Sequence, residues 1–161
     1  MDETITIIET EGYLKNYVNA HQIEAVYEQK AKNDEILILP MKYSADEYYF
    51  AQETVSFVKF CRDTSDAPPV DILVDGDIIV RSLHSFDIWL PVIYIASNIL
   101  LPVVVNLVSN FIYDKMKGRE HEDANVNAEI VIKNGKKEKF IHFKGDAKSF
   151  KEMMDKIDLN K

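Results

Sequence analysis

The chain has 161 residues, of which 47% are hydrophobic and 29% are charged, a composition typical of one globular domain that can bury its own core. Its formal net charge is −8, which argues against nucleic acid as a partner, because such binding depends on clustered Lys and Arg that neutralise phosphates. The single cysteine, Cys61, excludes an internal disulfide framework and predicts a cytoplasmic location. The acidic N-terminus does not resemble an export signal.

Three elements are predicted in the first 40 residues. A weak alternation of apolar and polar residues predicts a short edge strand over residues 4–8. Apolar residues at helical spacings predict an amphipathic helix within residues 11–30. The aliphatic run over residues 36–39, followed by Pro40, is typical of a strand that is buried on both faces.

A capping box predicts the next helix, over residues 45–63. Ser44 and Glu47 have the spacing at which the two side chains bond the free amides of a helix start. A second aliphatic strand, over residues 70–74, completes a strand–helix–strand stretch that is typical of a βαβ unit. The helix has one apolar stripe, which consists of Phe50, Thr54, Phe57, Val58 and Cys61.

The Asp75-Gly76 pair has two interpretations, a hairpin turn or the tight exit of a parallel strand. We favour a short second strand near residues 78–81. Asp71, Asp75 and Asp77 surround this turn, and their carboxylates are the oxygen ligands that hard cations prefer. Because Asp is also common in turns and at strand ends, we assign no metal site there.

The 26 residues from 88 to 113 contain no charged side chain. They are long enough to cross a bilayer, for which about 20 apolar residues suffice. Trp89 and Tyr113 lie near the two ends, as interfacial aromatic residues do. The run is therefore either a membrane span or a very apolar helix over residues 88–116 in the core of a domain.

Three features favour the buried helix. Pro102 removes a helical hydrogen bond that lipid cannot replace, and it predicts a kink or a new helix start. Asparagine amides need partners in lipid. A span would also have to translocate the 87-residue front half, with 17 acids and 7 bases, without a signal, or export residues 114–161, with 10 acids and 12 bases, against the positive-inside rule. We expect the polar stripe of the helix to face solvent or a partner, as a candidate interaction surface of Asn98, Pro102, Asn106, Ser109 and Asn110.

A hairpin is predicted around Asn134-Gly135. A two-residue loop would place lysines opposite isoleucines, whereas a four-residue loop over residues 134–137 aligns apolar pairs on one face. Because a one-residue slip turns every side chain to the other face, we predict the longer loop. Its register sets Ile130 opposite Ile141 and Ala128 opposite Phe143.

Asp146 is placed to cap a last helix over residues 146–157, whose buried stripe begins at Phe150. The predicted fold class is α/β (α+β). It is a two-layer sandwich in which a mixed sheet of about four strands is covered by this helix and by the helices over residues 45–63 and 88–116. We divide the chain into an N-terminal helical extension (1–34) and a single α/β domain (35–161).

The sequence contains no glycine-rich phosphate loop, no catalytic serine elbow and no CxxC pair. His21, His84 and His142 have no partner at ligand spacing, and His121 lies in a charged linker, so we expect structural or surface roles for them. Cys61 lies on an apolar stripe, where a lone cysteine is usually a small buried hydrophobe. We therefore assign no catalytic, metal or cofactor residue and expect no enzymatic activity.

The order of the elements resembles the effector-associated constant component of bacterial conflict and defence systems. The resemblance covers residues 35–158. It implies a non-catalytic accessory or adaptor subunit that couples an effector or sensor protein to its complex, and it carries over no catalytic residue. It is carried by ILILP (36–40), the helix from residue 45, VDILV (70–74), the long apolar run and the hairpin–helix of 128–157.

Three hypotheses on function follow. The first is a cytoplasmic interaction module that binds an effector or sensor protein through excess apolar helix surface, since exposed apolar patches mark interfaces. The second is a membrane-anchored or membrane-disrupting effector that uses residues 88–113 and is associated with the inner membrane. The third, which we favour least, is a hydrolase or metal enzyme built on Asp71, Asp75 and Asp77.

Overall fold

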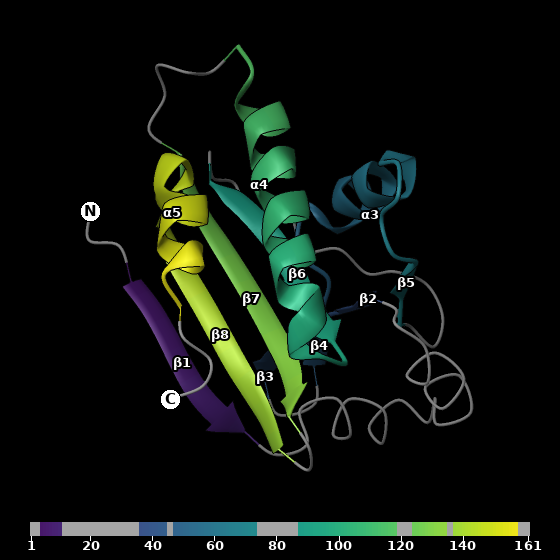
Figure 1. Ribbon diagram of the computed structural model, residues 1–161, viewed down its shortest axis with the longest axis vertical. Helices are drawn as coiled ribbons and strands as arrows, with labels where there is room; N and C mark the ends of the chain where they lie inside the picture. Colours follow the sequence, from purple (N-terminus) through teal and green to yellow (C-terminus); the bar gives the residue numbers. More distant parts are fainter. Residues whose placement is uncertain are drawn as a thin grey trace.

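The computed structural model of the chain describes residues 4–10, 36–44, 47–73, 87–118, 124–134 and 137–157. Its centre is a sheet of six strands in the order β1-β8-β7-β6-β2-β5 (Figure 1). The bounds are β1 (Thr4–Thr10), β2 (Ile36–Leu39), β5 (Val70–Ile72), β6 (Ile88–Ile95), β7 (Asn125–Asn134) and β8 (Lys137–Asp146). A separate hairpin consists of β3 (Met41–Ser44) and β4 (Glu47–Tyr49).

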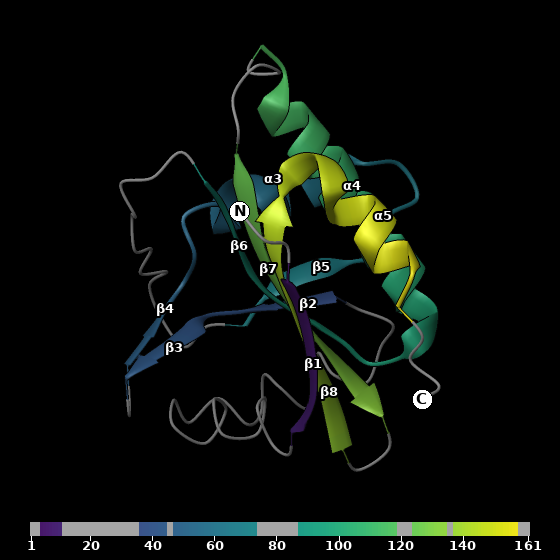
Figure 2. The same ribbon diagram turned by 90° about the vertical axis from the view of Figure 1, so that its left-hand side faces the viewer.

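The described α-helices cover one face of the sheet, as Figure 2 shows from the side. They are α3 (Thr54–Asp63), α4 (Leu101–Met116) and α5 (Phe150–Asp155), and two 3₁₀ turns, η1 (Asn98–Leu100) and η2 (Ala147–Ser149), precede α4 and α5. The sheet twists strongly, so that β2 runs across the direction of β8 (Figure 2). We call the face that the helices cover the inner face and the opposite one the outer face.

The sheet is mixed, which confirms the predicted fold class. β2 pairs with β5 in parallel, and α3 lies between them in the chain, as expected of the βαβ unit. β6 and β7 are also parallel, and the remaining neighbours are antiparallel. The sheet has six strands instead of about four, because residues 88–95 form a central strand and β1 extends the sheet at its edge.

The prediction of one helix over residues 88–116 is wrong. Residues 88–95 form β6, and the helix begins at Leu101 after the η1 turn. The first segment is rich in β-branched and aromatic residues, which favour a pleated, buried strand. Ser97 starts the helical part, since its hydroxyl accepts a hydrogen bond from Ile99 N at 3.2 Å. Pro102 lies in the first turn of α4, where its missing N–H costs nothing, so the predicted new start near this proline is confirmed.

β6 contains an irregularity that keeps its apolar residues buried. Ile88 and Leu90 belong to the inner core, and so do Ile93 and Ile95, although a regular strand would turn these two pairs to opposite faces. The register against β7 shifts between Trp89 and Val92, as in a β-bulge. Pro91, which has no N–H for the ladder, lies within this shift.

The capping box at Ser44 does not start a helix. Ser44 and Glu47 instead pair across the β3–β4 hairpin, and α3 begins at Thr54. The tyrosines between these points favour extended backbone over helix. The Thr54 hydroxyl donates to Ala51 O at 2.7 Å at the true helix start. The predicted apolar stripe is nevertheless buried throughout, with Phe50 lying just before the helix.

The C-terminal hairpin and the last helix agree closely with their prediction. Ala128 pairs with Phe143 and Ile130 with Ile141, which confirms the predicted register. The ladder extends to Asn134 opposite Lys137, so the loop is two residues shorter than predicted. Asp146 caps the last helical segment, since its Oδ1 accepts from Lys148 N at 2.8 Å.

Aromatic side chains join the helices to one another and to the sheet. Phe111 of α4 packs edge-on against two rings of α3, with centroid distances of 5.3 Å to Phe57 and 5.6 Å to Phe60. Phe143 of β8 and Phe150 of α5 make a similar contact at 5.1 Å. Each such pair adds about 0.5–1.5 kcal/mol to the gain from burial. These contacts therefore join α4 to α3 and α5 to β8.

Of the remaining predicted elements, the structure describes only the N-terminal edge strand. The edge strand is confirmed, and it pairs with β8 over Thr4–Thr10, so these residues belong to the main sheet. The helix within residues 11–30 and the strand near residues 78–81 lie outside the described residues, as does the boundary at residue 34. The division of the chain at that boundary therefore stays a prediction.

Candidate functional site

A groove runs between α4 and the η2–α5 segment, and its volume is about 430 Å³, within the range of ligand-binding clefts. Its floor consists of buried apolar side chains, Ile112 and Met116 from α4 and Ala147 and Phe150 from the facing segment. Tyr113 forms one wall and is 70% exposed. We call this feature the α4–α5 groove. α4 and α5 lie side by side along it in Figure 1.

The rim of the α4–α5 groove is basic. Lys117, Lys148 and Lys151 line it and are exposed, and among the described residues no acidic side chain is part of the lining. Lys117 lies 5.7 Å above the Tyr113 ring and 3.8 Å from Asp114, an exposed pair that contributes little. In a chain with a net charge of −8, this rim is a local site of positive potential beside an apolar floor.

The predicted interaction surface lies along the same helix. Asn98, Pro102, Asn106 and Asn110 are exposed, and Asn110 also lines the α4–α5 groove. Ser109 lines the groove as well, but it is half-buried and its hydroxyl donates to Val105 O at 2.7 Å. The sequence interpretation missed the apolar and basic neighbours of this stripe, because only the packing of α5 beside α4 brings them together. The exposed residues that extend the stripe are Ile99, Tyr113 and Lys117.

The described part of α4 with its η1 turn, Asn98–Met116, is the one described helix that is long and apolar enough to cross a membrane. It has 19 residues, and half of it is buried inside the protein. The core helix of a soluble domain has the same length and composition, so both hypotheses on location stay predictions.

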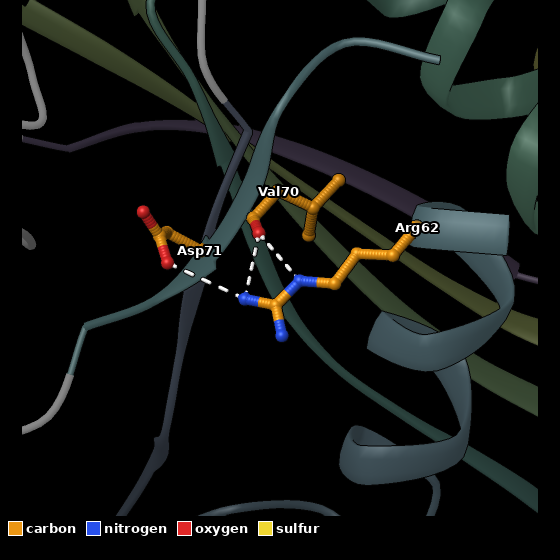
Figure 3. A network of polar contacts seen from close by, with 3 residues as sticks. All are labelled: Arg62, Val70 and Asp71. Atoms are coloured by element: carbon orange, nitrogen blue, oxygen red, sulfur yellow. Dashed lines mark hydrogen bonds and ion pairs between the residues drawn. The ribbon is translucent and has the colours of Figure 1, made fainter. Parts of the chain in front are cut away.

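Asp71, the described member of the candidate aspartate cluster, is held by an arginine (Figure 3). Arg62 Nη2 lies 3.4 Å from Asp71 Oδ1, and the same guanidinium donates to Val70 O at 3.1 and 3.3 Å. These contacts tie the end of α3 to β5. Asp75 and Asp77 lie outside the described residues, within which there is no group of three or more side chains suited to hold a metal ion.

Cys61 is expected to be chemically inert in the folded protein. It is buried on the inner side of α3, and burial raises the pKa of its thiol from 9.0 to about 12, so almost none of the reactive thiolate is present at pH 8. A chromogenic disulfide reagent should therefore label the native protein many times more slowly than the urea-unfolded chain. Fast, stoichiometric labelling of the native protein would contradict the burial of this thiol.

A second group of polar residues lies on the outer face of the sheet. Trp89 of β6 is in register with Asn127 of β7, and Glu129 of β7 faces His142 of β8. Lys144 lies opposite Asn127. We call these five residues the outer-face cluster. Their neighbours along each strand belong to the inner core, which places the five on the opposite face.

Burial shifts the charges of the outer-face cluster. It raises the pKa of Glu129 from 4.5 to about 7, because an apolar environment disfavours the carboxylate. Burial, together with the charge of Lys144, lowers the pKa of His142. His142 Nε2 lies 3.4 Å from Asn127 Oδ1, and because Oδ1 can only accept, Nε2 carries the proton of the neutral ring. The sequence interpretation had left His142 without a partner, although its own hairpin register sets Glu129 opposite this histidine.

Comparisons of the chain with protein-family models, with curated proteins and with solved structures find no match. The resemblance to the effector-associated constant component therefore stays a prediction.

Proposed function

We propose that this protein is a non-catalytic accessory or adaptor subunit that binds a partner protein through the α4–α5 groove. The observation that carries the proposal is an apolar floor surrounded by three exposed lysines on an otherwise acidic chain. The resemblance to the effector-associated constant component suggests that the protein works in a bacterial anti-phage defence system in the cytoplasm. Its partner would be an effector or sensor protein.

Charge and shape select an acidic, amphipathic segment of the partner as the occupant of the groove. A helix that lies in such a groove places apolar side chains on the floor and its polar side chains toward the rim. Acidic residues at the edges of that segment would meet Lys117, Lys148 and Lys151. Complementary charges of this kind accelerate association and exclude partners of the wrong charge. Tyr113, an exposed aromatic on the wall, is the expected anchor, since tyrosine is enriched among the residues that dominate binding.

The test uses two fluorescent amphipathic helical peptides that have the same apolar face and carry either Glu or Lys on the polar face. The acidic peptide should bind the protein, with an affinity that falls as salt is added, and the basic peptide should not. The double substitution Lys148→Glu and Lys151→Glu should weaken binding by about tenfold or more. The same pair should abolish retention of a partner when the tagged protein is isolated from its native host.

Lys59→Glu is the matched control, because this exposed lysine lies on α3, away from the groove. It is compared with the single groove substitution Lys151→Glu, which changes the net charge by the same amount, and it should leave binding of the acidic peptide unchanged. Equal binding of the two peptides by the wild-type protein would contradict the proposal. So would equal losses in Lys151→Glu and in Lys59→Glu, because the added negative charge of the whole protein would then explain the weaker binding of the acidic peptide.

The second candidate function is that of a membrane-anchored or membrane-disrupting effector, favoured by the length and composition of Asn98–Met116. In that case the purified protein should sediment with lipid vesicles and permeabilise them. Protein that stays in the supernatant after ultracentrifugation without detergent, and leaves vesicles intact, would exclude this function.

A further inference from the structure

Two buried hydrogen-bond donors lie side by side on the outer face of the sheet. Trp89 Nε1 and Asn127 Nδ2 are both inaccessible to solvent and have no hydrogen-bond partner. The two residues are in register on the neighbouring strands β6 and β7. Asn127 is only 7% exposed. Both groups can only donate a hydrogen bond, so each of them requires an acceptor.

Leaving such donors without an acceptor lowers the stability of the folded protein. Each costs about 1–3 kcal/mol when it is buried without an acceptor, and nearly all buried polar groups in proteins are paired. A simple core would carry apolar side chains at these two positions, as β6 and β7 do at the neighbouring outer positions Val92 and Val131. The pair of donors therefore has the character of a binding site whose acceptor is supplied from outside.

We propose that the outer-face cluster binds the carboxylate group of a small molecule, with Trp89 Nε1 and Asn127 Nδ2 as the two donors and Lys144 as the counter-charge. A carboxylate offers two oxygens with several lone pairs, so it can accept from both donors at once. Hydrogen bonds to a charged acceptor are about twice as strong as neutral ones. The site is independent of the α4–α5 groove, which lies on the inner face of the sheet.

The neighbours of the two donors suit an anion. Lys144 lies opposite Asn127 and contributes positive charge. His142 holds Asn127 Oδ1 at 3.4 Å, which directs Nδ2 away from β8 and toward β6. Glu129, two residues beyond Asn127 on the same face, would repel an anion if it were ionised. Its raised pKa keeps much of its carboxyl protonated near neutral pH.

Burial decreases from the centre of the sheet toward its edge. Asn127 is buried, His142 is half-buried, and Lys144 on β8 and Thr6 on β1 are exposed. β1 is the edge strand next to β8. Because both donors are closed to solvent, a small ligand would have to displace the side chains over them, entering from the β1–β8 side with its carboxylate first and Lys144 at the entrance.

Trp89 provides a direct readout, because it is the only tryptophan of the chain. A nitrogen–proton NMR spectrum of the labelled full-length protein at pH 6 will show one indole N–H signal. Titration with sodium acetate should move this signal, and the side-chain amide signals of Asn127, along one saturating curve in the millimolar range. Acetamide, which has the same shape and no charge, should bind at least tenfold more weakly. Inorganic phosphate should not saturate the site, because a tetrahedral oxyanion does not match a pair of donors on two adjacent strands as a planar carboxylate does.

Two substitutions test the roles of the residues. Asn127→Asp keeps the size of the side chain but replaces the donor with an acceptor, and it should abolish the acetate-dependent shift. Lys144→Gln, at an exposed position that tolerates change, should weaken acetate binding about tenfold. Its matched control is Lys133→Gln, which removes an equally exposed lysine from the same face at the far end of β7 and should leave binding unchanged.

Three results would overturn the proposal. The first is an indole signal that acetate does not move, which would mean that water alone satisfies the donors. The second is an equal response to acetate and acetamide. The third is an equal loss of binding in the Lys144 and Lys133 variants. Acetate binding would then depend on the net charge of the protein and not on a specific site.

Discussion

Replacing Glu129 with Gln is expected to stabilise the protein at pH 8 by about 3 kcal/mol and to remove most of its loss of stability between pH 5 and pH 8. Burial raises the pKa of this carboxyl from 4.5 to about 7. Between these two values the folded protein holds a proton that the unfolded chain has released. The free energy of unfolding therefore falls as pH rises through this range. Glutamine has the same size and no charge, so it avoids the cost of ionising a buried acid.

The measurement is urea unfolding of the wild type and of Glu129→Gln at several pH values from 5 to 8. Glu152→Gln is the control, because Glu152 is exposed on α5, and its substitution should leave the pH profile of the wild type unchanged. His142 acts in the opposite direction. Its lowered pKa means that the unfolded chain takes up the proton first, so this residue reduces stability as pH falls below its ordinary value. Parallel profiles for the wild type and Glu129→Gln would contradict the raised pKa.

Replacing Phe111 with Ala is expected to reduce the free energy of unfolding by about 3–5 kcal/mol. The Phe111 ring is 2% exposed and packs edge-on against Phe57 and Phe60 of α3. Its removal would leave a cavity that a rigid core closes only in part. Tyr113→Ala, two residues further along α4, should change stability by no more than about 0.5 kcal/mol, because this side chain is exposed.

The comparison of these two variants also tests where α4 lies. Unfolding by urea, followed by circular dichroism in buffer without detergent, should be cooperative, and the two variants should differ by several kcal/mol. A helix that lies in a bilayer would not give this result. Insoluble wild-type protein, or equal stability of the two variants, would favour the membrane hypothesis.

The C-terminal hairpin was predictable because its two faces differ in polarity. Only one register aligns Ile130 with Ile141 and Ala128 with Phe143, and the structure has this register. The same register sets Glu129 opposite His142 and Asn127 opposite Lys144, so four of the five residues of the outer-face cluster were already implied by the sequence. What the sequence did not show is that β7 lies inside the sheet, which buries Glu129 and changes its pKa.

The first part of the apolar run, residues 88–96, was harder to interpret because it has no strongly polar residue to set a period. Strand and helix both bury such a run completely, so the pattern does not distinguish them. Local signals were nevertheless present, in Pro91, in the β-branched residues around it and in Ser97 before the helix. The Ser44 capping box was misleading for a related reason, since the pairing of β3 with β4 outweighed the local helix signal.

The sequence by itself determined the mixed α/β class, the presence of strands that begin at Thr4, Ile36 and Val70, the hairpin register and the polar stripe of α4. These features depend on contacts between near neighbours or on strict periodicity, which a sequence displays directly. Only the tertiary structure decided that β6 lies in the middle of the sheet, that α5 lies beside α4, and that Trp89 meets Asn127. Each of these contacts joins residues that are far apart in the chain, so the α4–α5 groove and the outer-face cluster exist only once the layers have packed.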